Sequence, residues 1–197
     1  VAAFAASSST DPFTHGDATA GATKATVCFA CHGPAGNGSI NPAWPKLAGQ
    51  GSAYVLEQLT EFKSQTRKNP VMLGQATLLS EDDMRNLAAY FASQPFVPGV
   101  ASPKAVKVAE PLYRGGDPAR ELPAVADCHG PVGQGNPAGE IPRIGGQNSA
   151  YVAAQLSAYK AGTRGGANAK GQMMQAIASK LTDDEIQALA SYVSGLQ

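Results

Sequence analysis

The sequence predicts an all-α protein built from two copies of one small helical domain. The chain repeats itself in a register of 97 residues, and apolar residues recur at helical spacing near the end of each copy. No stretch alternates between apolar and polar residues as a half-buried strand would. Length alone allows one domain or two, and the repeat favours two.

The repeat is clearest around a shared "CHGP" string, which begins at Cys31 and again at Cys128. Downstream, "WPKLAGQ" aligns with "IPRIGGQ", and "GQGSAYVLEQLTEFKSQTR" matches "GQNSAYVAAQLSAYKAGTR" at 11 of 19 positions. After Arg67 and Arg164 the register becomes 102, because the second copy has five more residues in its "GGANAKGQ" stretch. A proline-rich stretch separates the copies. We therefore expect an N-terminal extension (1–17), a first domain (18–95), a linker (96–105) and a second domain (106–197).

Each copy is expected to contain a helix leading into the CHG string, a middle helix and a final helix. The middle helices should run from Ser52 to about Lys63 and from Ser149 to about Lys160. The final helices begin at the capping boxes Ser80-x-x-Asp83 and Thr182-x-x-Glu185. Their inward faces should carry Leu87, Tyr90, Phe91, Leu189, Tyr192 and Val193.

Composition excludes several classes of protein. Basic and acidic residues number 15 each, so the net charge favours neither nucleic acid nor an anionic membrane surface as a partner. The longest apolar run, 1–6, is far below the roughly 18 residues that span a bilayer, which predicts a soluble protein with no transmembrane segment. The start of the chain lacks a basic segment and a full apolar segment, so it is typical of a mature N-terminus whose signal peptide has been removed.

Cys28, Cys31 and His32 form a C-x-x-C-H motif, the attachment site of c-type haem. The alternatives are a disulfide with one spare thiol, or a zinc site. The adjacent histidine favours haem, and zinc would need a second pair of ligands that the sequence does not contain. Because bacteria attach such haem outside the cytoplasm, the motif predicts a periplasmic location.

Iron that only carries electrons needs two axial ligands. The histidines of the two CHG strings, His32 and His129, supply the first. Met72 and Met174 each lie eight residues before the cap of a final helix, so they occupy equivalent places in the repeat. We expect them to ligate iron from turn-like loops, since a thioether is the usual second ligand of an electron-transfer cytochrome c.

The second motif lacks its first cysteine, because the register places Val125 where the first copy has Cys28. We expect a second haem c attached by one thioether through Cys128, since Cys128, His129 and Met174 are all retained. The alternatives are a second copy that holds no haem, which would leave a large cavity, and a cysteine in place of the valine at position 125.

Other residues are expected to support the haem groups. The carbonyls of Pro45 and Pro142, thirteen residues after the two histidines, could accept their second ring N–H. Six repeat-matched polar residues are candidates for the haem propionates, although the tyrosines also suit an ordinary core: Gln50, Tyr54, Arg67, Gln147, Tyr151 and Arg164. Met84 and Met173 are assigned to packing, Trp44 to a haem edge and His15 to solvent.

The C-x-x-C-H-G motif, the following "PKLAGQ" and a methionine ahead of an "LSxxD" helix together resemble the cytochrome c4 family over about residues 18–197. The resemblance implies two class I cytochrome c domains related by a pseudo-twofold axis, with two haem c groups facing each other. Members are periplasmic electron carriers, soluble or loosely membrane-associated. They pass electrons from a quinol-oxidising complex or dehydrogenase to a terminal oxidase or reductase. Val125 departs from the family pattern.

Two alternative functions remain. The chain could be the cytochrome subunit of a complex like flavocytochrome c sulfide dehydrogenase, or a di-haem enzyme. An enzyme would need an open or unusual iron site, against which the two methionines argue. The expectation is therefore an electron carrier and not an enzyme.

Overall fold

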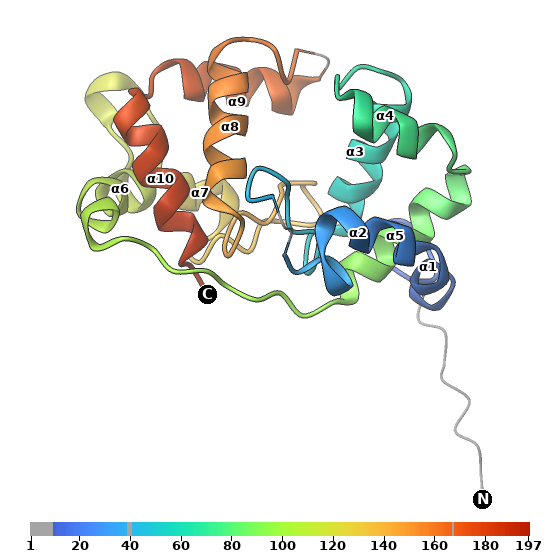
Figure 1. Ribbon diagram of the computed structural model, residues 1–197. Helices are drawn as coiled ribbons and strands as arrows, with labels where there is room; N and C mark the ends of the chain where they lie inside the picture. Colours follow the sequence, from blue (N-terminus) through green and yellow to red (C-terminus); the bar gives the residue numbers. More distant parts are fainter. Residues whose placement is uncertain (1–9, 39–40, 167) are drawn as a thin grey trace, which may run out of the picture.

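The computed structural model describes residues 10–38, 41–166 and 168–197, so the first nine residues, on which the expected mature N-terminus depends, lie outside it. Across the described residues the regular structure is helical, with isolated bridges but no strand. Figure 1 shows two groups of helices side by side, one from each half of the chain. The expectation of two tandem all-α domains is confirmed.

The first domain contains five α-helices and two short 3₁₀ turns among its described residues. The helices are α1 (Ala18–Ala25), α2 (Phe29–His32), α3 (Ser52–Lys63), α4 (Pro70–Thr77) and α5 (Glu81–Ser93). The turns span Thr26–Cys28 and Pro34–Gly36. Helix α5 packs against α1 and α3, and α4 packs against α3.

The second domain repeats this plan. Its helices are α6 (Pro103–Gly115), α7 (Val125–His129), α8 (Ser149–Lys160), α9 (Ala169–Ser179) and α10 (Asp183–Ser194), with a 3₁₀ turn at Pro118–Arg120. Helix α10 packs against α6 and α8, and α9 packs against α8. The two middle helices have the bounds that the sequence predicts.

Both predicted capping boxes are present. Ser80 Oγ accepts from Asp83 N at 3.1 Å, and the Asp83 carboxylate accepts from Ser80 N. Thr182 and Glu185 form the same pair of hydrogen bonds at the start of α10. Each box satisfies two backbone donors that a helix N-terminus leaves free, which fixes where α5 and α10 begin.

Two features of the local structure differ from expectation. Met72 and Met174 lie inside α4 and α9 rather than in loops. The reason is local, because the side chain of Asn69 caps α4 and Pro70 occupies its first turn, while Asn168 caps α9. Helix α6 begins at Pro103, within the range assigned to the linker, with the Ser102 hydroxyl as its cap.

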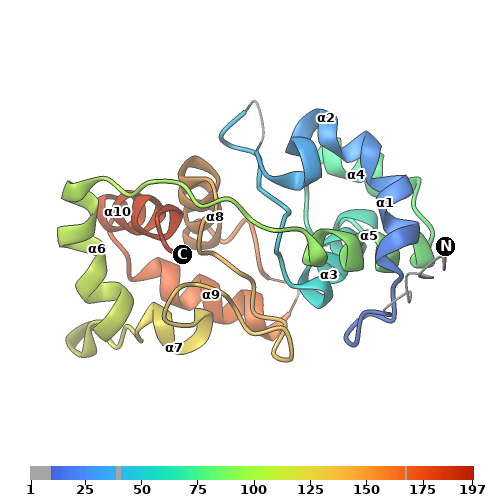
Figure 2. The ribbon, with the colours of Figure 1, turned by 90° about the horizontal axis from the view of Figure 1, so that it is seen from below.

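The connection between the domains is bonded to both of them. Asn37 of the first domain donates to the carbonyl of Pro95 at 2.6 Å and accepts from Val97 N at 2.8 Å. Gly99 N then donates to the carbonyl of Ser194 at the end of α10, at 2.8 Å. Figure 2 shows this connection crossing one face of the molecule between the two helical groups.

Candidate functional site

The C-x-x-C-H motif occupies the turn and helix that follow α1. Cys28 and Cys31 are free, half-buried thiols, and His32 is buried at the end of α2. Burial raises the pKa of the Cys28 thiol, and the neighbouring Cys31 raises it further. The next residue, Gly33, has φ of 77°, and a Cβ there would lie 1.5 Å from the carbonyl oxygen of Gly38. Only glycine permits this close return of the chain.

The second motif has the same backbone form with one thiol. Cys128 is free and half-buried, His129 is buried at the end of α7, and Gly130 has φ of 82°. Val125 packs against the apolar cluster of its domain, as Cys28 does in the first domain. The valine therefore occupies the place of the missing cysteine.

Each motif histidine makes a hydrogen bond to a proline carbonyl. His32 Nδ1 lies 2.8 Å from Pro45 O, and His129 Nδ1 lies 2.9 Å from Pro142 O. Burial lowers the pKa of both imidazoles, more than these hydrogen bonds raise it. Each ring is therefore neutral near pH 7 and donates from Nδ1, which leaves the lone pair of Nε2 free for a metal.

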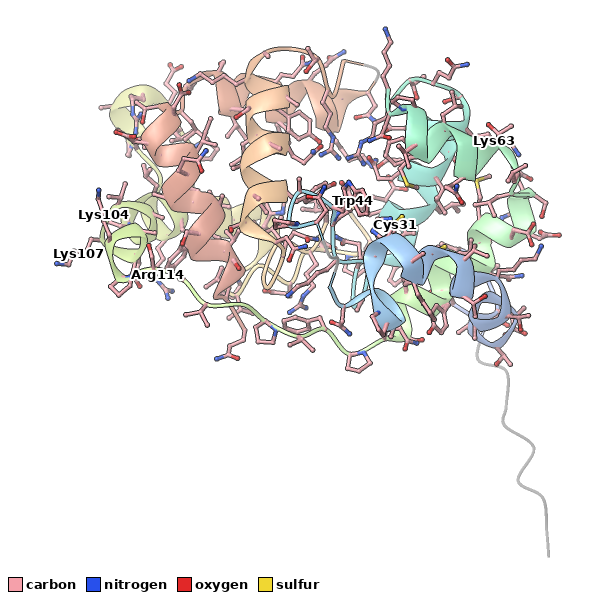
Figure 3. All side chains as sticks on the ribbon, in the orientation of Figure 1. Cys31, Trp44, Lys63, Lys104, Lys107 and Arg114 are labelled. Carbon is pink, nitrogen blue, oxygen red and sulfur yellow. The ribbon has the colours of Figure 1, made fainter. Side chains whose placement is uncertain are left out.

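One cavity of about 720 Å³ joins the two motifs. Its lining includes the three cysteines and both motif histidines, together with Met72 from α4 and Met174 from α9. Trp44 also lines it. Figure 3 shows Cys31 and Trp44 near the middle of the molecule, whereas Lys104, Lys107 and Arg114 point outward from α6. The structure thus brings the predicted site residues of both domains to a shared cavity.

The remaining methionines and His15 differ in how far they are buried. Met84 is buried in the first domain, as expected for packing. Met173 is 57% exposed, so its assignment to core packing is wrong. Its counterpart Val71 is similarly exposed, at 61%, and both residues also line part of the cavity. His15 is exposed.

Two glutamines bind the backbone of the opposite domain. Gln50 donates to the carbonyl of Arg143 at 3.0 Å and accepts from Arg143 N at 2.8 Å. Gln147 makes the same pair of hydrogen bonds with Lys46, at 2.9 and 2.8 Å. In the 97-residue register Gln50 corresponds to Gln147, and Lys46 corresponds to Arg143. The two pairs are therefore equivalent, which indicates a pseudo-twofold relation between the domains.

Arg67 and Arg164 cross the same interface. Arg67 donates to Gln58 of its own domain at 2.6 Å and to Tyr151 of the other at 3.0 Å. Arg164 correspondingly donates to Gln155 at 2.6 Å and to Tyr54 at 2.8 Å. Burial by itself would raise the pKa of the Tyr151 phenol. The positive charges of Arg67 and Arg164 outweigh this effect of burial, and the net result is a lowered pKa.

The six residues assigned to haem propionates therefore meet at the domain interface. Sequence analysis missed Gln58 and Gln155, which complete this network. A signal was available, because the two glutamines match each other in the 97-residue register, within the most similar stretch of the repeat.

These residues fit haem. Neither Arg67 nor Arg164 forms an ion pair with a carboxylate among the described residues, although both line the cavity. Two half-buried guanidinium groups without counter-charge suit a group that carries carboxylates. The free thiols suit attachment to the vinyl groups of haem, and the neutral imidazoles suit ligation of its iron. No described cluster of His, Cys, Asp and Glu side chains provides a separate metal site.

Comparison with known proteins agrees with this assignment. The family model for cytochrome c matches residues 18–95 and 126–197. The chain is 46% identical to a cytochrome c4 of Pseudomonas aeruginosa over 181 residues, which cover 92% of this chain and 89% of the relative. It is 36% identical to a thiosulfate dehydrogenase electron acceptor of Stutzerimonas stutzeri, covering 87% of this chain and 80% of the relative. A crystal structure of reduced recombinant cytochrome c4 from Pseudomonas stutzeri superposes with a TM-score of 0.88 at 42% identity, covering 92% of this chain and 100% of that one.

Proposed function

The chain belongs to the cytochrome c4 family, and from that premise we propose that it carries electrons in the periplasm from a donor complex or dehydrogenase to a terminal oxidase or reductase. It is an electron carrier and not an enzyme. The observation that supports the proposal most directly is the pair of repeat-related motifs that open on one cavity. Two redox groups held in one molecule would let an electron enter through one domain and leave through the other.

We assign the residues that would hold the two groups as follows. In the first domain, Cys28 and Cys31 attach haem, and His32 and Met72 ligate its iron. In the second, Cys128 alone attaches haem, while His129 and Met174 ligate. When bound, haem supplies one-electron oxidation and reduction at its iron.

The polypeptide provides a fixed environment for that chemistry. The carbonyls of Pro45 and Pro142 hold the imidazoles in one tautomer and orientation. Arg67 and Arg164 would balance the charge of buried propionates, and the apolar lining would exclude water. Because these groups are already bonded in place, little rearrangement would accompany a change of charge at the iron. We therefore propose outer-sphere transfer, in which the ligands stay bound.

The donor and acceptor belong to this proposal. The relative that acts as electron acceptor for thiosulfate dehydrogenase makes an enzyme that oxidises inorganic sulfur compounds one candidate donor, beside a quinol-oxidising complex. A permanent flavoprotein partner and a di-haem enzyme are less well supported, since the cytochrome c4 relatives match most of the chain. In the described part of the chain, no helix is long and apolar enough to cross a membrane.

Carbon monoxide tests the proposed ligand sets, because it binds ferrous haem only where a coordination position is open. We expect the reduced native protein to bind none. The variants Met72→Ala and Met174→Ala should each bind one equivalent, and the double variant two. Binding by the native protein would contradict the assignment and support an enzyme. A variant without binding would show that its methionine is not a ligand.

A further inference from the structure

The insertion in the second copy builds the first turn of α9, the helix that carries Met174. We propose that this turn is an interdomain clasp, in which Asn168 and Lys170 hold α9 against α3 of the first domain and thereby position Met174. The proposal rests on the assignment of Met174 as an iron ligand. Figures 1 and 2 both place the start of α9 beside α3.

Asn168 joins the cap of α9 to the other domain with one side chain. Its Oδ1 accepts from Gly171 N at 2.7 Å, which caps the helix. Its Nδ2 donates to Glu61 Oε1 on α3 at 2.8 Å. A displacement of α3 therefore acts directly on the N-terminus of α9.

Lys170 provides a second contact one turn along α3. Its Nζ lies 3.0 Å from Glu57 Oε1 and also pairs with Glu140 of its own domain. The lysine side chain is 38% exposed and that of Glu57 24%, so water screens the pair only in part. Glu57 and Glu61 are four residues apart and share one face of α3. That face thus presents two carboxylates to the clasp.

The corresponding helix of the first domain is capped differently. Asn69 Oδ1 accepts from Val71 N and Met72 N, both at 3.0 Å. In the described part of the chain, its hydrogen bonds stay within α4. Among the residues that the structure describes, only the Met174 helix is tied across the interface through its cap. Loosening the interface should therefore affect Met174 more than Met72.

The test uses the complete oxidised holoprotein with ¹³C-methyl-labelled methionine. Nuclear magnetic resonance then follows the two ligand methyl groups separately while imidazole, a neutral competitor, displaces them. In Asn168→Asp the cap acceptor is kept, since Asp and Asn cap equally well, but the donor to Glu61 becomes a repelling carboxylate. Lys170→Gln and Glu57→Gln each remove one side of the ion pair. The matched controls are Asn69→Asp at the other cap and Lys160→Gln, whose partner Asp183 lies in the same domain.

We expect imidazole to displace Met174 at concentrations about two- to fivefold lower in the three clasp variants, as the weakness of a partly screened pair implies. Met72 and both controls should keep native behaviour. Lys170→Gln and Glu57→Gln change the charge in opposite directions, so equal shifts indicate positioning, whereas opposite shifts would indicate electrostatics and overturn the proposal. The Lys170→Gln/Glu57→Gln double variant should shift no further than either single one. Hydrogen exchange at Gly171 N should rise in Lys170→Gln by a similar factor.

Unchanged displacement of Met174 in all three variants would refute the clasp. If imidazole displaced Met72 as easily as Met174 in these variants, the claim that the clasp acts selectively on Met174 would be refuted. The proposed function fails in a different way, because a native protein without an iron-shifted Met174 methyl signal would show that Met174 is not a ligand at all.

Discussion

The two domains hold equivalent pockets by different means. The first has two thiols, and its buried apolar cluster contains Ala25, Leu87 and Phe91. The second has one thiol, but its cluster draws on α6, α8 and α10 and includes the fully buried Tyr113. The Tyr113 hydroxyl donates to the carbonyl of Gly130, in the CHG string, at 2.6 Å. The comparison indicates that packing and the hydrogen bond from Tyr113 stabilise the second motif where a covalent bond is missing.

Removing single cysteines should separate the domains most sharply. Cys128→Ser should abolish all covalent attachment in the second domain, so that half of the haem is extracted from the denatured protein. Cys28→Ser should keep covalent haem in the first domain through Cys31. Mass spectrometry of the denatured variants checks both results. Two covalent haems in Cys128→Ser would show that the second domain uses another attachment residue.

Tyr113→Phe should weaken the second domain selectively. Burial raises the pKa of Tyr113 to about 12, so the phenol stays protonated and donates to Gly130 near pH 7. Loss of the hydroxyl removes one hydrogen bond to the carbonyl of Gly130, which keeps its bond from Gly133 N at 3.0 Å, so the expected cost is about 0.5–1.5 kcal/mol in the free energy of unfolding. Denaturant unfolding, monitored separately at each haem, measures this loss of stability. The control is Tyr90→Phe in the first domain, and an equal loss there would contradict the asymmetry.

Val125→Cys should make the second motif resemble the first. The new thiol would form a second thioether, and the α band of the reduced pyridine haemochrome should move to shorter wavelength as a vinyl group becomes saturated. By analogy with other short cross-links, we expect a gain of about 1 kcal/mol. For a domain of this size that corresponds to a rise in Tm of about 4–8 °C. An unchanged spectrum would mean that position 125 lies out of reach of the vinyl group.

The smallest expected difference between the two domains is in how low pH affects their stability. Hydrogen bonds from Arg120 lower the pKa of Glu185 to about 2, and hydrogen bonds to Ser80 and Lys24 lower that of its counterpart Asp83. A lowered carboxyl pKa contributes stability above the unfolded value, and this is lost as pH falls through the folded value. Glu185→Gln should therefore be less stable near pH 7 and flatten the pH dependence of unfolding between about 4.5 and 2. Unfolding free energies measured across this range check it, and an unaltered slope would contradict it.

Local signals predicted the parts of the fold that depend on neighbours in sequence. The capping boxes located α5 and α10, because a cap depends on residues three positions apart. The loop prediction for Met72 and Met174 was wrong, although Asn69-Pro70 and Asn168 carry helix-start signals. The packing role predicted for Met173 was wrong, because this side chain lines part of the cavity and is 57% exposed.

The interface is the part of the site that the sequence could not place. Gln50 and Arg143, like Arg67 and Tyr151, are far apart in the chain, and their pairing depends on how two folded domains dock. The insertion was visible in the repeat, but its contact with Glu57 and Glu61 was not.

By itself the sequence determined the tandem helical domains, the haem motifs and the unequal number of thiols, because spacing and covalent chemistry act over a few residues. Tertiary structure alone decided that both motifs open on one cavity, that each arginine bonds to the opposite domain, and that one methionine helix is tied across the interface. These contacts join residues about 100 positions apart, and their geometry is set by the packing of whole domains.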